Sequence, residues 1–158
     1  MKKLIPALLL NLACNSLPPP AAITVNASTP DVVARSIVVA RDAWCVADVG
    51  WCPEIVEWGG AEVVVTRWDG AGKPGGPGET LEETGWIGPA AHADAWRVEV
   101  VPEFVTDLDL PGVLAHEFGH FCLDGHVGAS ALMRPEHVDP IQPIVDAAAA
   151  SAWRRHCP

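Results

Sequence analysis

Residues 116–120 contain the side chains of this sequence that are best suited to chemistry. They read His-Glu-Phe-Gly-His, and on a helix His116 and His120 lie about 40° apart around the axis and about 6 Å apart along it. Both imidazoles can therefore reach one metal ion, and neutral imidazole is a common ligand of Zn²⁺. Glu117 is next to the first histidine, where its carboxylate can take a proton from a water molecule at the metal. The spacing predicts a zinc site with Glu117 as the general base.

A catalytic zinc site usually has three protein ligands and a fourth position open to water. The residues that follow the histidine pair offer two candidates for the third ligand. We favour His126, ten residues after His116, and Asp124 is the alternative. The segment Ser-Ala-Leu-Met-Arg-Pro, residues 130–135, follows closely.

This arrangement resembles the metzincin clan of zinc peptidases, whose extended motif HExxHxxGxxH supplies a third histidine and whose later Met-turn places a methionine beneath the metal. The resemblance covers mainly residues 112–136. It implies Glu117 as the general base and Met133 as the turn methionine. The residues to which it gives a zinc-binding role are His116, His120 and His126.

The same resemblance implies a fold and an activity. The fold would be α+β and zincin-like, with a small twisted sheet, a backing helix, the zinc helix, the Met-turn and a final helix. The activity would be zinc-dependent hydrolysis of peptide bonds in proteins or peptides. We expect the substrate to lie extended along an edge strand of the sheet.

Two positions depart from that family's pattern. Leu123 occupies the position of the family's glycine, whose left-handed backbone ends the helix. We expect Gly125 to supply the positive φ instead, two residues later. Many family members also have a tyrosine after the turn methionine, whereas this chain contains none. Arg134 and His137 are the two candidates to replace it in stabilising the oxyanion.

The elements that must position these residues follow from apolar spacing and from turn residues. Thr29-Pro30-Asp31 carries a capping hydroxyl, a proline and an acid, which together indicate a helix start. The expected elements are a helix over 30–46, a strand over 61–68, a surface loop over 70–78, a strand over 96–101, a helix over 112–122 and a closing helix over 140–155. This order predicts an α+β domain.

The N-terminus carries the pattern of an export signal. A cationic start precedes an apolar run over residues 4–13, which is too short to span a bilayer as a helix. The run ends at Leu12-Ala13-Cys14, which resembles the lipobox of bacterial lipoproteins and makes Cys14 a lipidation site. Ordinary signal cleavage and an uncleaved anchor are the alternatives. The expected division is a signal peptide over 1–13, a tether over 14–28 and a zinc peptidase domain over 29–158.

Four cysteines remain when Cys14 is set aside, and an even number in an exported chain indicates disulfides. Three connectivities are possible. We favour Cys45 with Cys52, which are seven residues apart across an expected turn, and therefore Cys122 with Cys157. The second bond would pin the closing helix to the zinc helix.

Composition limits the partners of the protein. The 158 residues suit one domain, and 49% of them are apolar, which excludes disorder. Twenty acidic and ten basic residues give a net charge of −10, which would repel the phosphates of nucleic acid. We expect a monomer that is exported, either as a cell-envelope lipoprotein or as a secreted protein, and that contacts membrane only through a lipid on its N-terminus.

Three alternative interpretations stay open at this point. The chain could be a non-catalytic zinc-binding lipoprotein that uses the fold as a binding module. It could also be a zinc amidase that acts on cell-wall peptides rather than on proteins. His92 and Asp94 could contribute to a second metal site, although we favour their being ordinary polar loop residues.

Overall fold

A computed structural model describes residues 18–65, 91–94, 96–101, 105–135 and 141–157, with the backbone alone for 91–94. Within these ranges the strands are β1 (Ala22–Thr24), β2 (Glu54–Val56), β3 (Ala61–Val65), β4 (Ala91–Asp94) and β5 (Arg97–Val100). The helices are α1 (Asp31–Val46), α3 (Leu110–Gly119) and α4 (Ala147–His156). The protein therefore has the α+β architecture that the sequence predicts.

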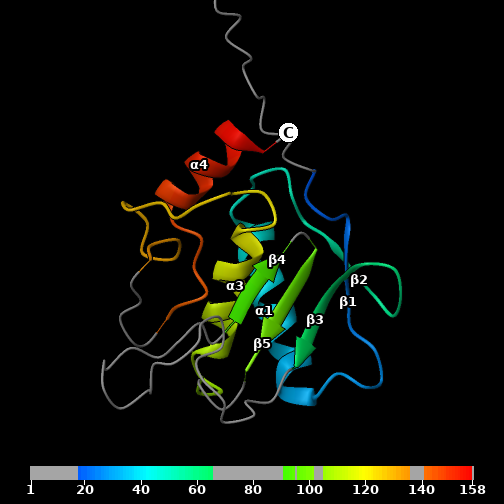
Figure 1. Ribbon diagram of the computed structural model, residues 1–158. Helices are drawn as coiled ribbons and strands as arrows, with labels where there is room; N and C mark the ends of the chain where they lie inside the picture. Colours follow the sequence, from blue (N-terminus) through cyan, green and yellow to red (C-terminus); the bar gives the residue numbers. More distant parts are fainter. Residues whose placement is uncertain (1–17, 66–90, 95, 102–104, 136–140, 158) are drawn as a thin grey trace, which may run out of the picture.

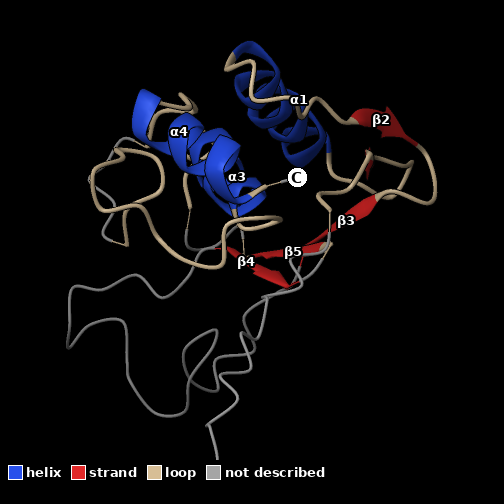
Figure 2. Ribbon diagram, turned by 90° about the horizontal axis from the view of Figure 1, so that it is seen from above, coloured by secondary structure: helices blue, strands red, loops and turns tan. Residues whose placement is uncertain are grey.

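The strands form one sheet in the order β2-β1-β3-β5-β4 (Figure 1). The neighbours β2, β1, β3 and β5 run parallel, whereas β4 pairs with β5 in the antiparallel direction. Helices α1 and α3 lie on the same face of the sheet (Figure 2). Strand β4 lies at one edge of the sheet and contacts α3, so this edge is close to the helix that carries His116.

Helix α1 confirms the helix predicted over 30–46 to within one residue. Its fully buried residues recur three or four positions apart, which gives one apolar stripe. They are Val33, Ile37, Ala40 and Trp44. The indole Nε1 of Trp44 donates a hydrogen bond of 2.8 Å to the carbonyl of Ala115. This bond ties α1 to α3 at the residue that precedes His116.

The sheet takes one of its inner strands from the segment that was expected to be a tether. Strand β1 lies within residues 14–28, pairs with both β2 and β3, and places Ile23 at 0% exposure. The folded part of the chain therefore begins before residue 29. Three residues are too few to show an alternating pattern, so only parallel pairing on both sides identifies this segment as a strand.

Helices α3 and α4 have boundaries different from those predicted. Helix α3 begins two residues earlier than residue 112 and ends at Gly119 rather than at residue 122. Helix α4 begins at Ala147, well after residue 140. Its start is set by Asp146, whose carboxylate accepts two backbone N–H bonds of the first turn. Pro143 disfavours helical backbone for the residue before it, which keeps the preceding segment irregular.

Besides β1, two further strands were missed, and two predictions extend beyond the described residues. Strand β5 confirms the strand predicted over 96–101, but β2 and the antiparallel β4 were not expected. Strand β3 covers the first five residues of the strand predicted over 61–68. Its last three residues and the predicted loop over 70–78 lie outside the described ranges.

Both predicted disulfides are confirmed. Cys45 and Cys52 are bonded with their Cα atoms 4.6 Å apart, and Cys122 and Cys157 with theirs 5.8 Å apart. Cys122 lies in the turn after α3 rather than on the helix. Two disulfides are consistent with an exported protein. No helix in the described ranges combines the length and apolar character that a bilayer span requires.

Candidate metal centre

Helix α3 carries His116 on a buried element, and His120 follows directly as the C-cap residue of the same helix. Nine of its residues are buried, so the helix is packed on every side rather than on one stripe. Gly119 allows a close contact, because a β-carbon at this position would overlap the Sδ atom of Met133 and lie 3.2 Å from Cζ2 of Trp44. A larger residue than the glycine of the His-Glu-Phe-Gly-His segment would force the buried end of the Met133 side chain to shift.

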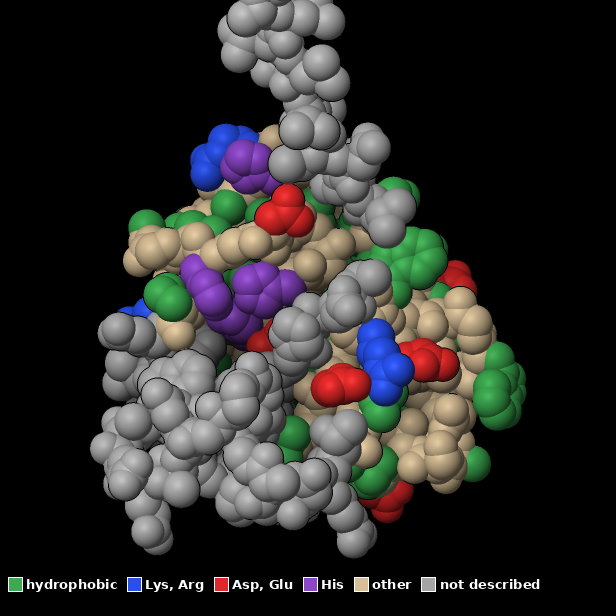
Figure 3. Space-filling view, in the orientation of Figure 1, with side chains coloured by type: hydrophobic (Ala, Val, Ile, Leu, Met, Phe, Trp, Pro, Cys, Tyr) green, Lys and Arg blue, Asp and Glu red, His purple; other side chains and the backbone are tan. Residues whose placement is uncertain are grey.

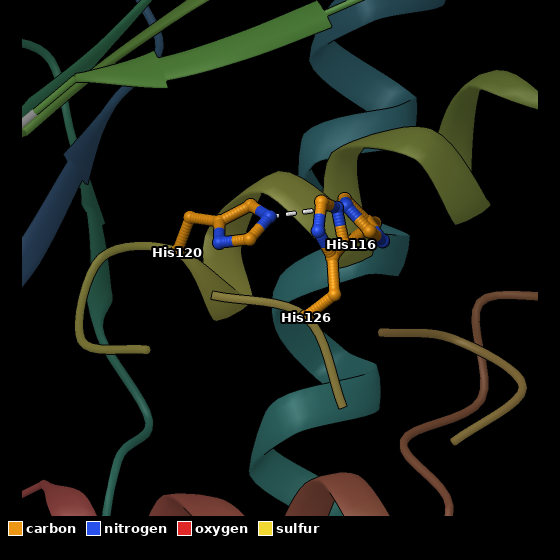
Figure 4. A group of neighbouring side chains, drawn as sticks. All are labelled: His116, His120 and His126. Atoms are coloured by element: carbon orange, nitrogen blue, oxygen red, sulfur yellow. Dashed lines mark hydrogen bonds between the residues drawn. The ribbon is translucent and has the colours of Figure 1, made fainter. Parts of the chain in front are cut away.

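The structure brings the three predicted histidine ligands together. Each of His116, His120 and His126 offers a ring nitrogen, and these nitrogens all lie within 4.8 Å of one another. Figure 4 shows the ring of His116 reaching from α3, that of His120 from the end of this helix and that of His126 from the following loop toward the same point. His116 is buried, His120 is half-buried and His126 is exposed, so the cluster opens to solvent on one side. The histidines gather in the middle of one face of the molecule (Figure 3).

Two backbone carbonyls orient the helix histidines. The Nδ1 atom of His116 lies 2.6 Å from the carbonyl oxygen of Leu132, and Nδ1 of His120 lies 3.0 Å from that of Leu123. A carbonyl oxygen can only accept, so each Nδ1 carries the hydrogen and donates. In the neutral rings the Nε2 atoms then present lone pairs. Such outer hydrogen bonds are the usual way in which proteins fix the tautomer of a metal-binding histidine.

The donor set fits a metal ion of the size of zinc. The two Nε2 atoms of His116 and His120 lie 3.1 Å apart. Figure 4 draws this contact as a hydrogen bond, which needs a hydrogen on one of the two atoms. With the hydrogen on Nδ1 in both rings, two lone pairs face each other and repel unless a proton or a metal cation lies between them. A zinc ion would lie about 2.0 to 2.1 Å from each nitrogen, which this spacing permits. Among the described residues, the histidine triad is the group of His, Cys, Asp and Glu side chains that could hold a metal ion.

The chain leaves α3 without any left-handed residue, so the expectation for Gly125 is wrong. Positive φ within the described ranges occurs at Asp48, Gly50 and Gly59. The last turn tightens instead through bonds between residues three apart, which are His120 N to Glu117 O, Phe121 N to Phe118 O and Cys122 N to Gly119 O. Leu123, 4% exposed, packs in the core and directs its carbonyl at His120.

Met133, the turn methionine that the resemblance implied, lies in the core next to the end of α3. Its side chain is fully buried against Gly119. We call residues 130–133 the methionine turn. The carbonyl of Met133 accepts a hydrogen bond of 2.7 Å from the N–H of Val127, the neighbour of His126. The methionine turn therefore supports the loop that carries the third histidine.

The other candidate residues lie outside the group of histidine ligands. Glu117 lies on α3 beside His116 and is 8% exposed. Asp124 is exposed and does not belong to the group of potential ligand atoms. Arg134 follows the methionine turn, and its buried Nε makes no hydrogen bond within the described residues. His137 and Cys14 lie outside those residues.

His92 and Asp94 both belong to β4, whose backbone alone is described. A cleft of about 530 Å³ borders the exposed histidine, between the loop after α3 and α4. Its lining includes Leu123, Asp124, His126, Val127, Arg155 and His156. This cleft gives a solvent route to the third histidine.

Sequence reasoning missed the carbonyls of Leu123 and Leu132 and the role of Gly119. The residue type does not show which backbone carbonyl accepts a hydrogen bond. A glycine within a predicted helix, however, can indicate close packing. Neither the protein-family models nor the curated proteins compared with this chain match it. The resemblance to metzincins therefore rests on the sequence pattern of residues 112–136 alone.

Proposed function

We propose that this protein is a zinc-dependent hydrolase of peptide bonds, acting within protein or peptide chains. The observation that carries the proposal is the histidine triad, with ring nitrogens within 4.8 Å of one another and Glu117 adjacent on the same helix. Backbone carbonyls hold the rings of His116 and His120 in place, while His126 is exposed to solvent. A purely structural zinc site is normally closed by a fourth protein ligand.

Glu117 is the proposed general base. Zinc, when bound, would polarise the substrate carbonyl and lower the pKa of the attacking water. The Glu117 carboxylate accepts a proton from that water and then passes it to the nitrogen of the leaving amine. His116 and His120 would hold the metal through Nε2, because the carbonyls of Leu132 and Leu123 occupy their Nδ1 atoms and keep those rings from rotating. His126 would supply the third ring nitrogen.

Strand β4 supports an extended peptide as the substrate. It pairs with β5 on one side, and within the described residues no strand pairs with its outer edge. An extended peptide can add to such an edge through main-chain hydrogen bonds. Because β4 contacts α3, a peptide bound there would pass close to the histidine triad. Peptide binding in this mode suits cleavage within a chain.

The decisive experiment replaces Glu117 by Gln. We expect the variant to keep about one zinc ion per chain and to lose roughly 10²- to 10⁴-fold in hydrolysis, because the amide preserves shape but cannot accept the proton. Zinc content and turnover are measured on the same preparation. A variant that hydrolyses a general protein substrate at the wild-type rate would contradict the proposed role of Glu117.

The two alternative functions are separated by the products. Mass spectrometry of reactions with protein substrates and with cell-wall peptides distinguishes a protease from an amidase. A wild-type protein that binds zinc but hydrolyses neither substrate would support the non-catalytic binding module instead.

A further inference from the structure

Asp146 joins the closing helix to the methionine turn through its two carboxylate oxygens. One oxygen, Oδ1, accepts hydrogen bonds of 3.0 Å from the backbone N–H groups of Ala148 and Ala149. These bonds cap the first turn of α4, which would otherwise leave N–H groups unsatisfied. A helix cap of this kind needs only one side-chain oxygen.

The second oxygen of Asp146 faces away from α4 and holds the methionine turn. Oδ2 accepts hydrogen bonds from Ser130 Oγ at 2.8 Å, from Ala131 N at 2.7 Å and from Leu132 N at 3.2 Å. The Ser130 hydroxyl in turn accepts a bond of 2.8 Å from the N–H of Met133. The backbone of the turn is thus gathered around a single carboxylate oxygen.

Leu132 connects this carboxylate to a metal ligand. Its N–H donates to Asp146, while its carbonyl accepts the Nδ1 hydrogen of His116 at 2.6 Å. Its side chain is 2% exposed, so core packing also restrains the residue. The position of the carbonyl that orients His116 therefore depends on where Asp146 holds the turn.

The charge of Asp146 strengthens this arrangement. Burial by itself would raise the pKa of the carboxyl, but the hydrogen bonds from Ala149, Ser130, Leu132 and Ala131 outweigh it and lower the pKa below its usual value. The group is therefore ionised near neutral pH. Hydrogen bonds to an ionised acceptor are about twice as strong as those between neutral groups.

We infer that Asp146 is a positioning residue for the metal centre, acting on His116 through Leu132. The inference rests on the proposed metal site but does not require that the site be catalytic. A helix cap alone would use Oδ1 and would leave the affinity for metal unchanged. The three bonds to Oδ2 give the residue its second role.

The test replaces Asp146 by Asn, which keeps one oxygen for the cap and presents an amide NH₂ group to the three donors of the turn. We expect zinc affinity, measured by chelator competition, to fall by about 10- to 100-fold, the usual cost of losing an outer-sphere partner. Nitrogen NMR of the metal-free protein should also show a smaller population of the Nδ1–H tautomer of His116. A role confined to the helix cap would move neither quantity.

Arg154→Ala is the matched control on the same helix. The Arg154 guanidinium donates to the carbonyls of Ala47 and Asp48 and so anchors α4 away from the turn. This variant should keep zinc affinity within about twofold of wild type. If it loses as much affinity as Asp146→Asn, the effect comes from α4 docking and the inference is wrong.

Ser130→Ala provides a second route if Asp146→Asn does not fold. It keeps the carboxylate but removes the bond from Ser130 to Oδ2 and the bond that Ser130 accepts from the Met133 N–H, so we expect zinc affinity to fall by about 3- to 10-fold. Unchanged affinity in the folded variants would overturn the role of Asp146. A wild-type protein without zinc would overturn the metal site and this inference together, whereas zinc binding without hydrolysis would overturn the peptidase proposal alone.

Discussion

His116 and His126 reach the same point from two very different settings. His116 projects from a helix that is packed on every side, is 3% exposed, and has its ring held by the Leu132 carbonyl. His126 projects from an irregular loop and is exposed to solvent. Its support is indirect, because the bond to the methionine turn comes from its neighbour Val127.

The difference separates the part of the site that is set before metal binds from the part that adjusts. A ligand that is already oriented loses little conformational freedom when the metal arrives, whereas an exposed loop side chain loses more. His116 should therefore determine most of the affinity for zinc. His126 and its loop should determine the shape of the coordination position that is left open to water. Substitutions that affect the two sides unequally test this reasoning.

The largest effect is expected for removal of the preset ligand. His116→Ala should lower zinc affinity by more than about 100-fold. Removal of a residue that only hydrogen-bonds to a ligand costs up to about 100-fold, and removal of the ligand itself should cost more. His126→Ala should cost less, because His116 on α3 and His120 at the end of that helix still bind. Chelator competition measures both, with His156→Ala as a control outside the triad. Equal losses at positions 116 and 126 would remove the distinction between the two sides.

The two disulfides should also differ in their effects on stability and on zinc binding. By loop length, loss of the Cys122–Cys157 bond should reduce the free energy of unfolding by about 4 kcal/mol, and loss of the Cys45–Cys52 bond by about 2 kcal/mol. Each pair is replaced by serines, and unfolding is followed in urea. Only the first replacement should also weaken zinc binding, because Cys122 lies in the turn that supplies a carbonyl to His120. A matching loss of zinc affinity in the Cys45–Cys52 variant would contradict this.

Two glycines that lie next to the histidines in the sequence should differ in how much stability they lose when replaced by alanine. Gly119→Ala introduces a β-carbon against Met133 and Trp44, and we expect it to cost about 1 to 3 kcal/mol of unfolding free energy. Gly125→Ala meets open space at a position without positive φ, so it should stay within about 0.5 kcal/mol of wild type. Thermal melts of both variants decide the matter. A strongly destabilised Gly125→Ala would restore the idea that this residue turns the chain.

The smallest effect is expected in the pH dependence of stability. The pKa of Asp146 lies below its ordinary value of 3.8, because hydrogen bonds outweigh the opposite effect of burial. A carboxyl with a lower pKa in the folded state stabilises the fold above its unfolded pKa, and this stabilisation is lost as the pH falls through the folded pKa. Metal-free wild type and Asp146→Asn should thus differ in stability by a constant amount above about pH 5 and converge in acid. Urea titrations at several pH values measure this, and a difference that persists unchanged in acid would contradict it.

The sequence allowed prediction of those features that depend on side-chain type and spacing. The triad, helix α1 and both disulfides belong to this class, because each rests on residues at characteristic separations. The carbonyl partners of His116 and His120 do not, since every residue has a carbonyl and only the three-dimensional structure selects one. Strand β1 was missed because its partners are distant in the sequence. The error at Gly125 arose because a helix can also end by tightening, with no left-handed residue.

The position of β1 changes how far the protein could reach from a membrane. Pro20 is already fixed to the domain, because its carbonyl accepts a hydrogen bond of 2.7 Å from Nε1 of Trp51. If Cys14 carries a lipid, the chain from Cys14 to Pro20 spans at most about 20 Å, whereas a tether that continued to residue 28 would span about 50 Å. The domain would then stay close to the bilayer surface. If the protein is the proposed peptidase, its substrates would be selected by their presence in that thin layer as much as by any contact with the cleft.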